Sequence, residues 1–223
     1  MGIIDLLFPK SCLGCGSPNS YICASCIQKV KLPRAICPTC LRFSLDGKTH
    51  IKCLTPQGLN GLISLWNYDG VVRKAILALK FKFAKEIATE LSDLAARRIP
   101  SRTFFPNDSV LIPIPIYWLR RNWRGFNQSE EIGKRIALKA GWKFTSDLLI
   151  RKERSVPQTE LKRKERLENV RGVFSLNPGY KQTFTNYILF DDVWTTGSTL
   201  KAACKVLKRS GVEKVWGFTL AKG

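Results

Sequence analysis

Apolar and polar positions follow two kinds of pattern along residues 59–223. Short apolar runs predict strands at 62–68, 110–114, 148–150, 187–190 and 214–220. Segments whose apolar residues recur about every three to four positions predict helices at 71–82, 84–97, 127–140, 159–170 and 198–209. Strands that alternate with helices predict an α/β domain, built on a parallel sheet with right-handed crossover connections.

Most of the cysteines lie in front of this domain, within the first 58 residues. A unit of roughly fifty residues rarely buries enough apolar surface to fold without a metal or disulfides. The sequence therefore predicts two parts, a small metal-binding module at 1–58 and an α/β domain at 59–223.

Three Cys-x-x-Cys pairs and one His-x-x-Cys pair supply the chemistry of the module. The two-residue gap lets both ligands of a pair reach one metal ion, and four such ligands close a tetrahedral Zn²⁺ site that has no position for catalysis. Sequential pairing predicts two structural zinc sites. Their ligands are Cys12, Cys15, Cys23 and Cys26 for the first, and Cys37, Cys40, His50 and Cys53 for the second.

Other arrangements of these residues stay open at this point. Interleaved pairing also satisfies the spacing. A disulfide framework is typical of small secreted chains, but the seven cysteines of the module would leave one unpaired. His50 is the only histidine of the chain, so we expect no histidine general base. Cys204 lies inside a predicted helix and is expected to be a small buried core residue.

Residues 187–200, YILFDDVWTTGSTL, combine an apolar strand, two carboxylates and a short turn that opens a helix. Backbone N–H groups and hydroxyls of such a turn can hold one phosphate, with the positive end of the helix behind them. A glycine in the turn lets the backbone approach the phosphate closely. The predicted phosphate-binding residues are Thr195, Thr196, Gly197, Ser198 and Thr199.

Asp191 and Asp192 directly precede this turn. Carboxylates at this place suit ribose hydroxyls, or a Mg²⁺ ion that a diphosphate carries, so the whole segment describes a site for a phosphorylated ribose. The same two residues are the candidates if an acid or base assists a reaction. The alternatives are a capped strand-to-helix turn, in which Asp and Thr are ordinary cap residues, and a plain mononucleotide-binding turn.

Basic residues outnumber acidic ones 37 to 17, and the net charge of +20 is typical of proteins that handle polyanions. Basic clusters lie at 120–124, 151–154 and 162–166, and aromatic residues are interleaved with the first. Arginines beside aromatic rings suit single-stranded nucleic acid. The candidate nucleic-acid contacts are Arg120, Arg121, Trp123, Arg163 and Lys164. Alternatively, the arginines contact a diphosphate and the third cluster is a solvated helix face.

The segment 188–199 resembles the phosphoribosyl diphosphate (PRPP) motif of type I phosphoribosyltransferases, two acidic residues followed by a TTGxT loop. With the zinc pairs in front, the whole chain resembles the ComF family of competence-associated, phosphoribosyltransferase-like proteins. Further matching positions are Tyr68, Lys80, Phe81, Pro113, Pro115, Arg120, Arg121, the run Arg124-Gly125-Phe126-Asn127-Gln128, Gln158, Leu161, Arg166, Asn169, Val170 and Phe174. His50 departs from the family, which more often has cysteine there.

The resemblance implies a phosphoribosyltransferase-like fold with an N-terminal double zinc ribbon. It also implies that the 195–199 loop holds the 5'-phosphate, that Asp191 and Asp192 contact the 2' and 3' hydroxyls, and that Lys80 and Arg124 belong to the PRPP site with Mg²⁺. Members of the family take part in natural transformation, handling incoming single-stranded DNA in the cytoplasm, with other competence proteins such as a helicase as further partners. Residues 158–169 would form a mobile loop over the site.

Two functions from different classes follow from these expectations. The first is a phosphoribosyltransferase with an unidentified acceptor, such as an enzyme of nucleotide salvage. The second is a non-catalytic DNA-binding competence factor that keeps the phosphate site. The chain shows no signal peptide, and its longest apolar run, 110–119, contains two prolines and is too short to span a bilayer. We therefore expect a cytoplasmic protein without membrane insertion.

Overall fold

The structure, a computed structural model, describes residues 10–79, 84–99, 105, 108–117, 126–152, 172–180 and 186–223. The helix predicted at 159–170 lies outside these ranges. So do the site residues Lys80, Arg120, Arg121, Trp123, Arg124, Arg163 and Lys164. The described residues contain no helix with the length and apolar character that a bilayer crossing requires.

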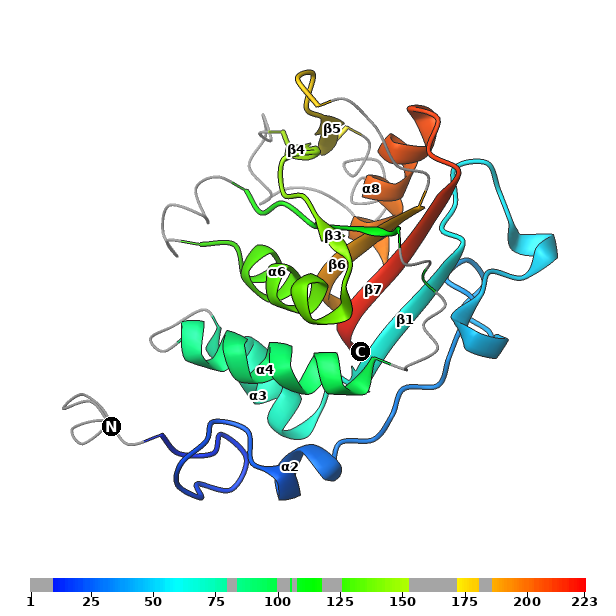
Figure 1. The fold of residues 1–223 in the computed structure, drawn as a ribbon. Helices are drawn as coiled ribbons and strands as arrows, with labels where there is room; N and C mark the ends of the chain where they lie inside the picture. Colours follow the sequence, from blue (N-terminus) through cyan, green and yellow to red (C-terminus); the bar gives the residue numbers. More distant parts are fainter. Residues whose placement is uncertain are drawn as a thin grey trace, which may run out of the picture.

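A parallel sheet forms the centre of the molecule (Figure 1). Within the described residues its strands are β1 (Gly61–Asn67), β2 (Val110–Pro113), β3 (Lys143–Phe144), β6 (Asn186–Trp194) and β7 (Lys214–Lys222). Their spatial order is β1-β7-β6-β2-β3, and all neighbouring pairs are parallel. The predicted α/β class with a parallel sheet is therefore confirmed.

Strand β6 is apolar on both sides because both faces of the sheet are covered. Ile188 and Phe190 belong to the core on one face, and Tyr187 and Leu189 belong to the core on the other. None of the four side chains is more than 1% exposed. A continuous apolar run, rather than an alternating one, is what a parallel strand buried on both faces requires.

Helices divide between the two faces of the sheet (Figure 1). The first face packs against α3 (Gly70–Ala78), α4 (Ala84–Arg98) and α6 (Gln128–Ala140), and the second against α8 (Ser198–Arg209). The N-cap of helix α6 is Asn127, whose Oδ1 accepts a hydrogen bond from Ser129 N, and its C-cap is Gly141 in the left-handed region. These boundaries match the predicted helices at 127–140 and 198–209.

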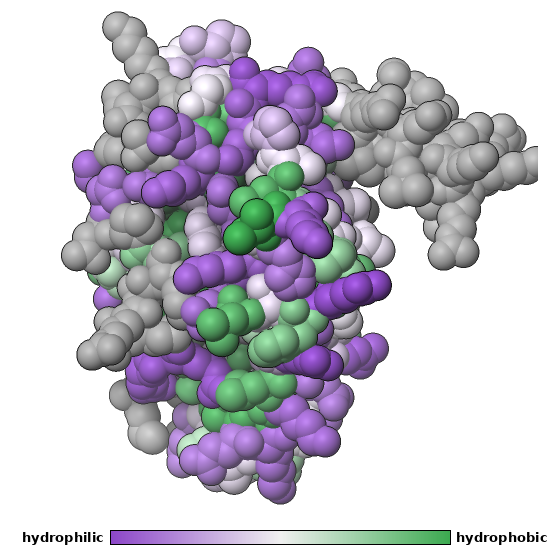
Figure 2. All heavy atoms as spheres, turned by 90° about the vertical axis from the view of Figure 1, so that its right-hand side faces the viewer, coloured by the Kyte–Doolittle hydropathy of each residue, from purple (hydrophilic) through white to green (hydrophobic). Residues whose placement is uncertain are grey.

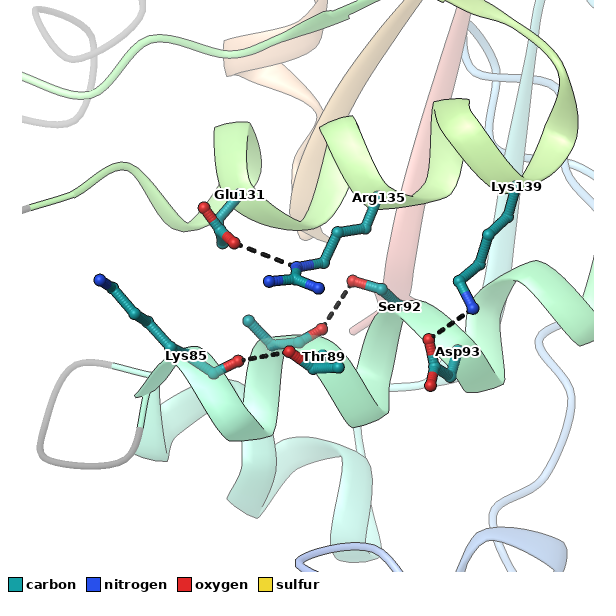
Figure 3. A network of polar contacts seen from close by, with 8 residues as sticks. Lys85, Thr89, Ser92, Asp93, Glu131, Arg135 and Lys139 are labelled. Carbon is teal, nitrogen blue, oxygen red and sulfur yellow. Dashed lines mark hydrogen bonds and ion pairs between the residues drawn. The ribbon is translucent and has the colours of Figure 1, made fainter.

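Helices α4 and α6 pack side by side, and polar groups line the outer edge of their contact (Figure 3). Lys139 Nζ on α6 lies 2.8 Å from Asp93 Oδ1 on α4. An exposed ion pair of this kind contributes at most about 1 kcal/mol to stability. The fully buried Leu91 of α4 and Ile136 of α6, both at 0% exposure in the same core, contribute more through burial of apolar surface.

One predicted strand does not join the parallel sheet. The segment predicted at 148–150 forms β4 (Leu149–Arg151), which pairs antiparallel with β5 (Phe174–Leu176) in a separate small sheet. Its expected place in the parallel sheet is therefore wrong. The edge next to β2 is taken by β3, whose two residues are too few to show a periodic pattern.

The cysteine-rich segment packs on the domain at two separate places. Its first part contains the short helix α2 (Ala24–Gln28) and shares a core with α3 and α4 through Tyr21, Ile22 and Val30. Glu90 Oε2 on α4 accepts hydrogen bonds of 2.9 Å from both Tyr21 N and Ile22 N. The first part is therefore bound to α4 by polar as well as apolar contacts.

The second part runs beside β1 (Figure 1) and contains the 3₁₀ turns η1 (Leu45–Gly47) and η2 (Ile51–Cys53). Ile36 and Leu59 join the core of the opposite face, which includes α8. The two parts of the segment therefore contact opposite faces of the sheet. The predicted boundary between residues 58 and 59 lies just before β1.

Candidate functional site

The predicted phosphate turn lies between β6, in the middle of the sheet, and α8. Gly197 is the N-cap residue of α8 and has a φ of 72°. A Cβ at this position would lie 2.0 Å from the ring of Trp194, which is only 2% exposed. The backbone conformation and the close ring therefore both require glycine. Glycine has no side chain, so Gly197 does not cap the first N–H groups of α8 with a side-chain hydrogen bond.

Hydroxyl groups surround these N–H groups. Thr196 Oγ1 donates to Ser198 Oγ at 3.1 Å and accepts from Ser198 N at 3.4 Å. Thr195 and Thr196 are exposed, while Ser198 and Thr199 are half-buried. The turn thus presents hydroxyl and amide donors together at the carboxyl edge of a parallel sheet, where such sheets bind ligands.

The acidic pair lies at the end of β6, because the strand continues through both carboxylates to Trp194. Asp191 Oδ1 accepts a hydrogen bond of 3.4 Å from Ser129 Oγ and one of 3.0 Å from Asp192 N. Ser129 belongs to the first turn of α6. The acidic pair is therefore held between the end of the central strand and the amino end of a helix.

Burial, and then the neighbouring Asp192 carboxylate, raise the pKa of Asp191 to about 7. The hydrogen bonds from Asp192 N and Ser129 Oγ and the positive charge of Arg151 act in the opposite direction but do not cancel the increase. Asp191 therefore changes its charge near neutral pH. A perturbed carboxyl pair at the edge of a sheet is typical of a functional site.

A cavity of about 300 Å³ lies at the start of α6, the helix whose first turn carries Ser129. Its wall includes Pro113 and Pro115 after β2, Asn127 and Glu130 at the start of α6, and Arg151 on β4. The charge of Arg151 acts on Asp191, so the cavity and the carboxylates belong to one electrostatic environment. A small polar or charged ligand fits this wall better than an apolar one.

Ser129 and Arg151 are the site residues that sequence reasoning does not identify as neighbours of Asp191. Ser129 is 62 positions away in the chain, and a single serine carries no signal of such a contact. Asn127 and Gln128 of the RGFNQ run are nearly buried and position α6. Asn127 Nδ2 donates to Ile114 O at 3.1 Å, and Gln128 Nε2 donates to Leu79 O at 3.4 Å.

The structure brings each predicted set of metal ligands together. Within each set the ligand atoms lie within 4.8 Å of one another, and the sets are Cys12, Cys15, Cys23, Cys26 and Cys37, Cys40, His50, Cys53. The grouping is sequential, not interleaved. All seven cysteines of these two sets are free, so no disulfide framework forms.

Distances within the sets fit a tetrahedral metal site. With a Zn–S bond of about 2.3 Å, two tetrahedral thiolates lie about 3.8 Å apart. Cys15 Sγ and Cys23 Sγ are 3.7 Å apart, and Cys40 Sγ lies 3.4 Å from His50 Nδ1. With Nδ1 on the metal side, His50 Nε2–H donates to Phe43 O at 3.0 Å, a contact that fixes the ring orientation of a ligand.

Cys204 lies apart from both ligand sets, in the middle of α8. It is 0% exposed and belongs to the core that α8 shares with the sheet. Burial raises the pKa of its thiol to about 12. The expectation of a buried core residue is therefore confirmed, and a thiol with this pKa is a poor nucleophile.

Comparison with known proteins finds relatives over nearly the whole chain, although no protein-family model matches it. The chain is 28% identical to the DNA utilization protein YhgH of Salmonella typhi, over 97% of this chain and 99% of that protein. It is 30% identical to Competence protein F of Haemophilus influenzae, over 66% of this chain and 68% of that protein. Competence protein ComFC of Bacillus subtilis is 27% identical over 92% of this chain and 85% of that protein.

Similar solved structures include adenine phosphoribosyltransferases. The enzyme of Leishmania tarentolae matches with a TM-score of 0.35 and 18% identity, over 61% of this chain and 71% of that chain. The enzyme of Trypanosoma brucei matches with a TM-score of 0.33 and 14% identity, over 61% and 64%. A likeness of this size says nothing about activity.

Proposed function

The chain belongs to the competence protein F (ComF) family, and from this we propose that it binds PRPP with Mg²⁺ at the β6–α8 turn and handles incoming single-stranded DNA during natural transformation. The turn and its acidic pair support the first half of this proposal. The second half is supported by relatives whose names refer to competence and to DNA utilization. The two halves are tested separately.

The observation that carries the PRPP proposal is Gly197 in the left-handed region, with the acidic pair just before it. A phosphate held by the N–H groups of Ser198 and Thr199 places its ribose towards the end of β6. There, Asp191 and Asp192 offer acceptors for the 2' and 3' hydroxyls. The spacing thus suits both ends of a phosphorylated ribose.

The enzymatic form of the proposal is displacement of diphosphate from C1' of the ribose by an acceptor. Mg²⁺ supplies positive charge to the leaving diphosphate when it is bound, and Asp191 and Asp192 are the residues that would hold it. Arg151 adds positive charge on the cavity wall, and Lys80 and Arg124 are proposed to contact the diphosphate. Diphosphate release in the presence of candidate acceptors separates this form from a non-catalytic factor.

Calorimetric titration of PRPP with Mg²⁺ into the zinc-loaded protein is expected to show saturable binding. The double variant Asp191→Asn/Asp192→Asn should bind about tenfold more weakly or worse, a loss of about 1.4 kcal/mol, because amides replace the acceptors for the ribose hydroxyls. Asp93→Asn, an equivalent change on α4, serves as the matched control. A folded parent that does not bind PRPP contradicts the proposal, as does an equal loss in the control.

The raised pKa of Asp191 adds an expected pH dependence. Since this pKa is about 7 in the folded state, compared with an ordinary value of 3.8, folding stability falls as the pH rises through this interval. Affinity for Mg²⁺ and PRPP should change in the opposite sense and rise from about pH 6 to about pH 8, because the carboxylate is the binding form. In Asp191→Asn the part of the pH dependence of affinity that arises from this carboxylate should disappear, and only the part that arises from titration of PRPP itself should remain.

Single-strand binding is expected to be electrostatic. The affinity for a thymidine oligonucleotide should fall about tenfold or more between about 50 and 200 mM salt, as counterions are released from each phosphate contact. Arg120→Ala/Arg121→Ala should reduce the slope of log affinity against log salt concentration by about 0.7 for each lost phosphate contact. Lys139→Ala on the α4–α6 edge should leave this slope unchanged. Absence of binding at low salt would remove the DNA half of the proposal.

A further inference from the structure

Large apolar side chains are exposed in one short stretch of the chain. Of the eight that are exposed in the described residues, six lie between residues 32 and 54. We call these six the apolar rim, and they are Leu32 (60% exposed), Leu41 (52%), Phe43 (53%), Leu45 (72%), Ile51 (89%) and Leu54 (49%). Figure 2 faces the side of the molecule on which β1 and the second metal group lie, and shows apolar side chains gathered among hydrophilic ones. Clustered exposure of this kind marks an interaction surface more often than chance exposure does.

Part of the apolar rim surrounds the second metal group. Three of its members directly follow a ligand in the chain, in the pairs Cys40-Leu41, His50-Ile51 and Cys53-Leu54. Because the ligand atoms lie within 4.8 Å of one another, the backbone segments that carry the three apolar residues converge on the same group. All three side chains are exposed around this ligand set.

The first metal group shows the opposite arrangement. Leu13 and Ile27 follow its ligands Cys12 and Cys26, and both pack against the core under α3 and α4. Apolar residues that directly follow a ligand are thus packed against the domain in the first group and exposed in the second. Metal binding alone does not account for the exposure of Leu41 and Ile51.

A hollow of about 170 Å³ adjoins the apolar rim. It lies between residues 33–36 and 46–47 of the second metal segment and residues 62–64 of β1. Leu32 and Leu45 of the rim directly precede the wall segments that begin at Pro33 and Asp46. Arg34 is a further wall residue, and its guanidinium carbon lies 5.1 Å from the ring centre of Phe43 in a cation–π contact. The surface thus offers a recess for one large side chain of a partner beside an exposed apolar area.

The charge around the apolar rim has one sign. Exposed basic residues of this stretch are Lys31, Arg34, Arg42, Lys48 and Lys52. Asp46 is its single acidic residue and lies 3.9 Å from Lys48 Nζ. A second copy of the chain would bring the same positive charges face to face, which is unfavourable. Nucleic acid would gain little from leucine and isoleucine, which do not stack on bases, and Phe43 is the only aromatic residue of the rim.

From this geometry we propose that the apolar rim is a docking surface for a partner protein whose apolar segment is flanked by aspartate and glutamate. An apolar side chain of the partner enters the hollow beside β1, and its acidic flanks meet the basic border of the rim. The inference goes beyond the proposed function and does not depend on PRPP binding, because no rim residue belongs to the β6–α8 turn.

The first test places a photocrosslinking amino acid, p-benzoylphenylalanine, at Ile51 in the full chain expressed in its native host. The control position is Leu138, which is 82% exposed on α6. We expect a protein crosslink from position 51 that position 138 does not give. A crosslink only to a second copy, only to nucleic acid, or equally from both positions overturns the proposal.

The second test uses the partner protein that the crosslink identifies, in purified form. Its affinity for the full chain should fall about tenfold or more with Ile51→Ser/Leu54→Ser, fall similarly with Lys48→Glu/Lys52→Glu, and stay unchanged with Leu138→Ser. All of these side chains are exposed, so the variants should fold, and zinc content and thermal midpoint are measured to verify this. Unchanged affinity in either rim variant, or no acidic residues at the crosslinked site of the partner, overturns the proposal.

Discussion

Removal of zinc by a strong chelator is expected to unfold residues 10–60 and to lower the thermal midpoint of the whole protein. Structural zinc sites contribute apparent binding free energies of about 10–16 kcal/mol in small zinc domains, and this free energy is what folds them. The effect should reach the α/β domain, because Tyr21, Ile22 and Val30 share a core with α3 and α4. Far-ultraviolet circular dichroism and scanning calorimetry, before and after chelation, measure both effects.

Single ligand variants should divide this effect between the two metal groups. The parent is expected to hold two zinc ions per chain by elemental analysis, and Cys12→Ser and Cys40→Ser one each. Cys12→Ser should destabilise more, since Cys12 is 4% exposed within the core while Cys40 is exposed. Cys204→Ala, which changes a buried cysteine outside both groups, should retain two. A parent without zinc, or ligand variants that keep two ions, would show that the cysteines serve another purpose.

Gly197→Ala is expected to abolish PRPP binding and to destabilise the protein by about 2–5 kcal/mol. A left-handed backbone costs a non-glycine residue about 1–2 kcal/mol, and overpacking in a tight site costs about 1–3 kcal/mol. The new Cβ would lie 2.0 Å from the buried ring of Trp194, so either the ring or the turn must move. Urea denaturation measures the stability, and calorimetry measures the binding.

Gly211→Ala is the matched control for this prediction. Gly211 has a φ of 95°, but a Cβ there meets nothing within 4 Å. The control should therefore lose about 1–2 kcal/mol for the backbone alone and keep PRPP binding. If Gly197→Ala bound PRPP as tightly as this control, the turn would not be the phosphate site.

Long periodic segments are what the sequence predicts best in this chain. The helices at 127–140 and 198–209 and the strand at 187–190 appear in the structure as α6, α8 and β6, because each has an apolar pattern that only one kind of element can bury. The short strands β3 and β5 are not predicted. Two or three residues form a strand only when a neighbouring strand pairs with them, and that depends on tertiary structure.

In the candidate site, too, the residues that are neighbours in sequence are predicted and the contacts that depend on tertiary packing are not. The metal ligands and the phosphate turn are local in sequence, so their spacing indicates which residues meet. The contact of Ser129 with Asp191 depends on how α6 packs beside β6, and no local pattern reports it. Leu13 and Leu41 each follow a cysteine, yet one packs on the core and the other is 52% exposed. That difference arises from the docking of each metal group on the domain.

The strand order also determines when this protein can assemble during synthesis. Apart from an isolated bridge between Gly61 and Lys48, β1 pairs within the described residues only with β7, so this edge of the sheet cannot form before Trp216 has left the ribosome. Both metal groups, in contrast, draw all their ligands from short stretches made early. Assembly of the two ligand sets can therefore precede closure of the sheet, and a nascent chain would carry both sets complete while the domain still lacks its central strands.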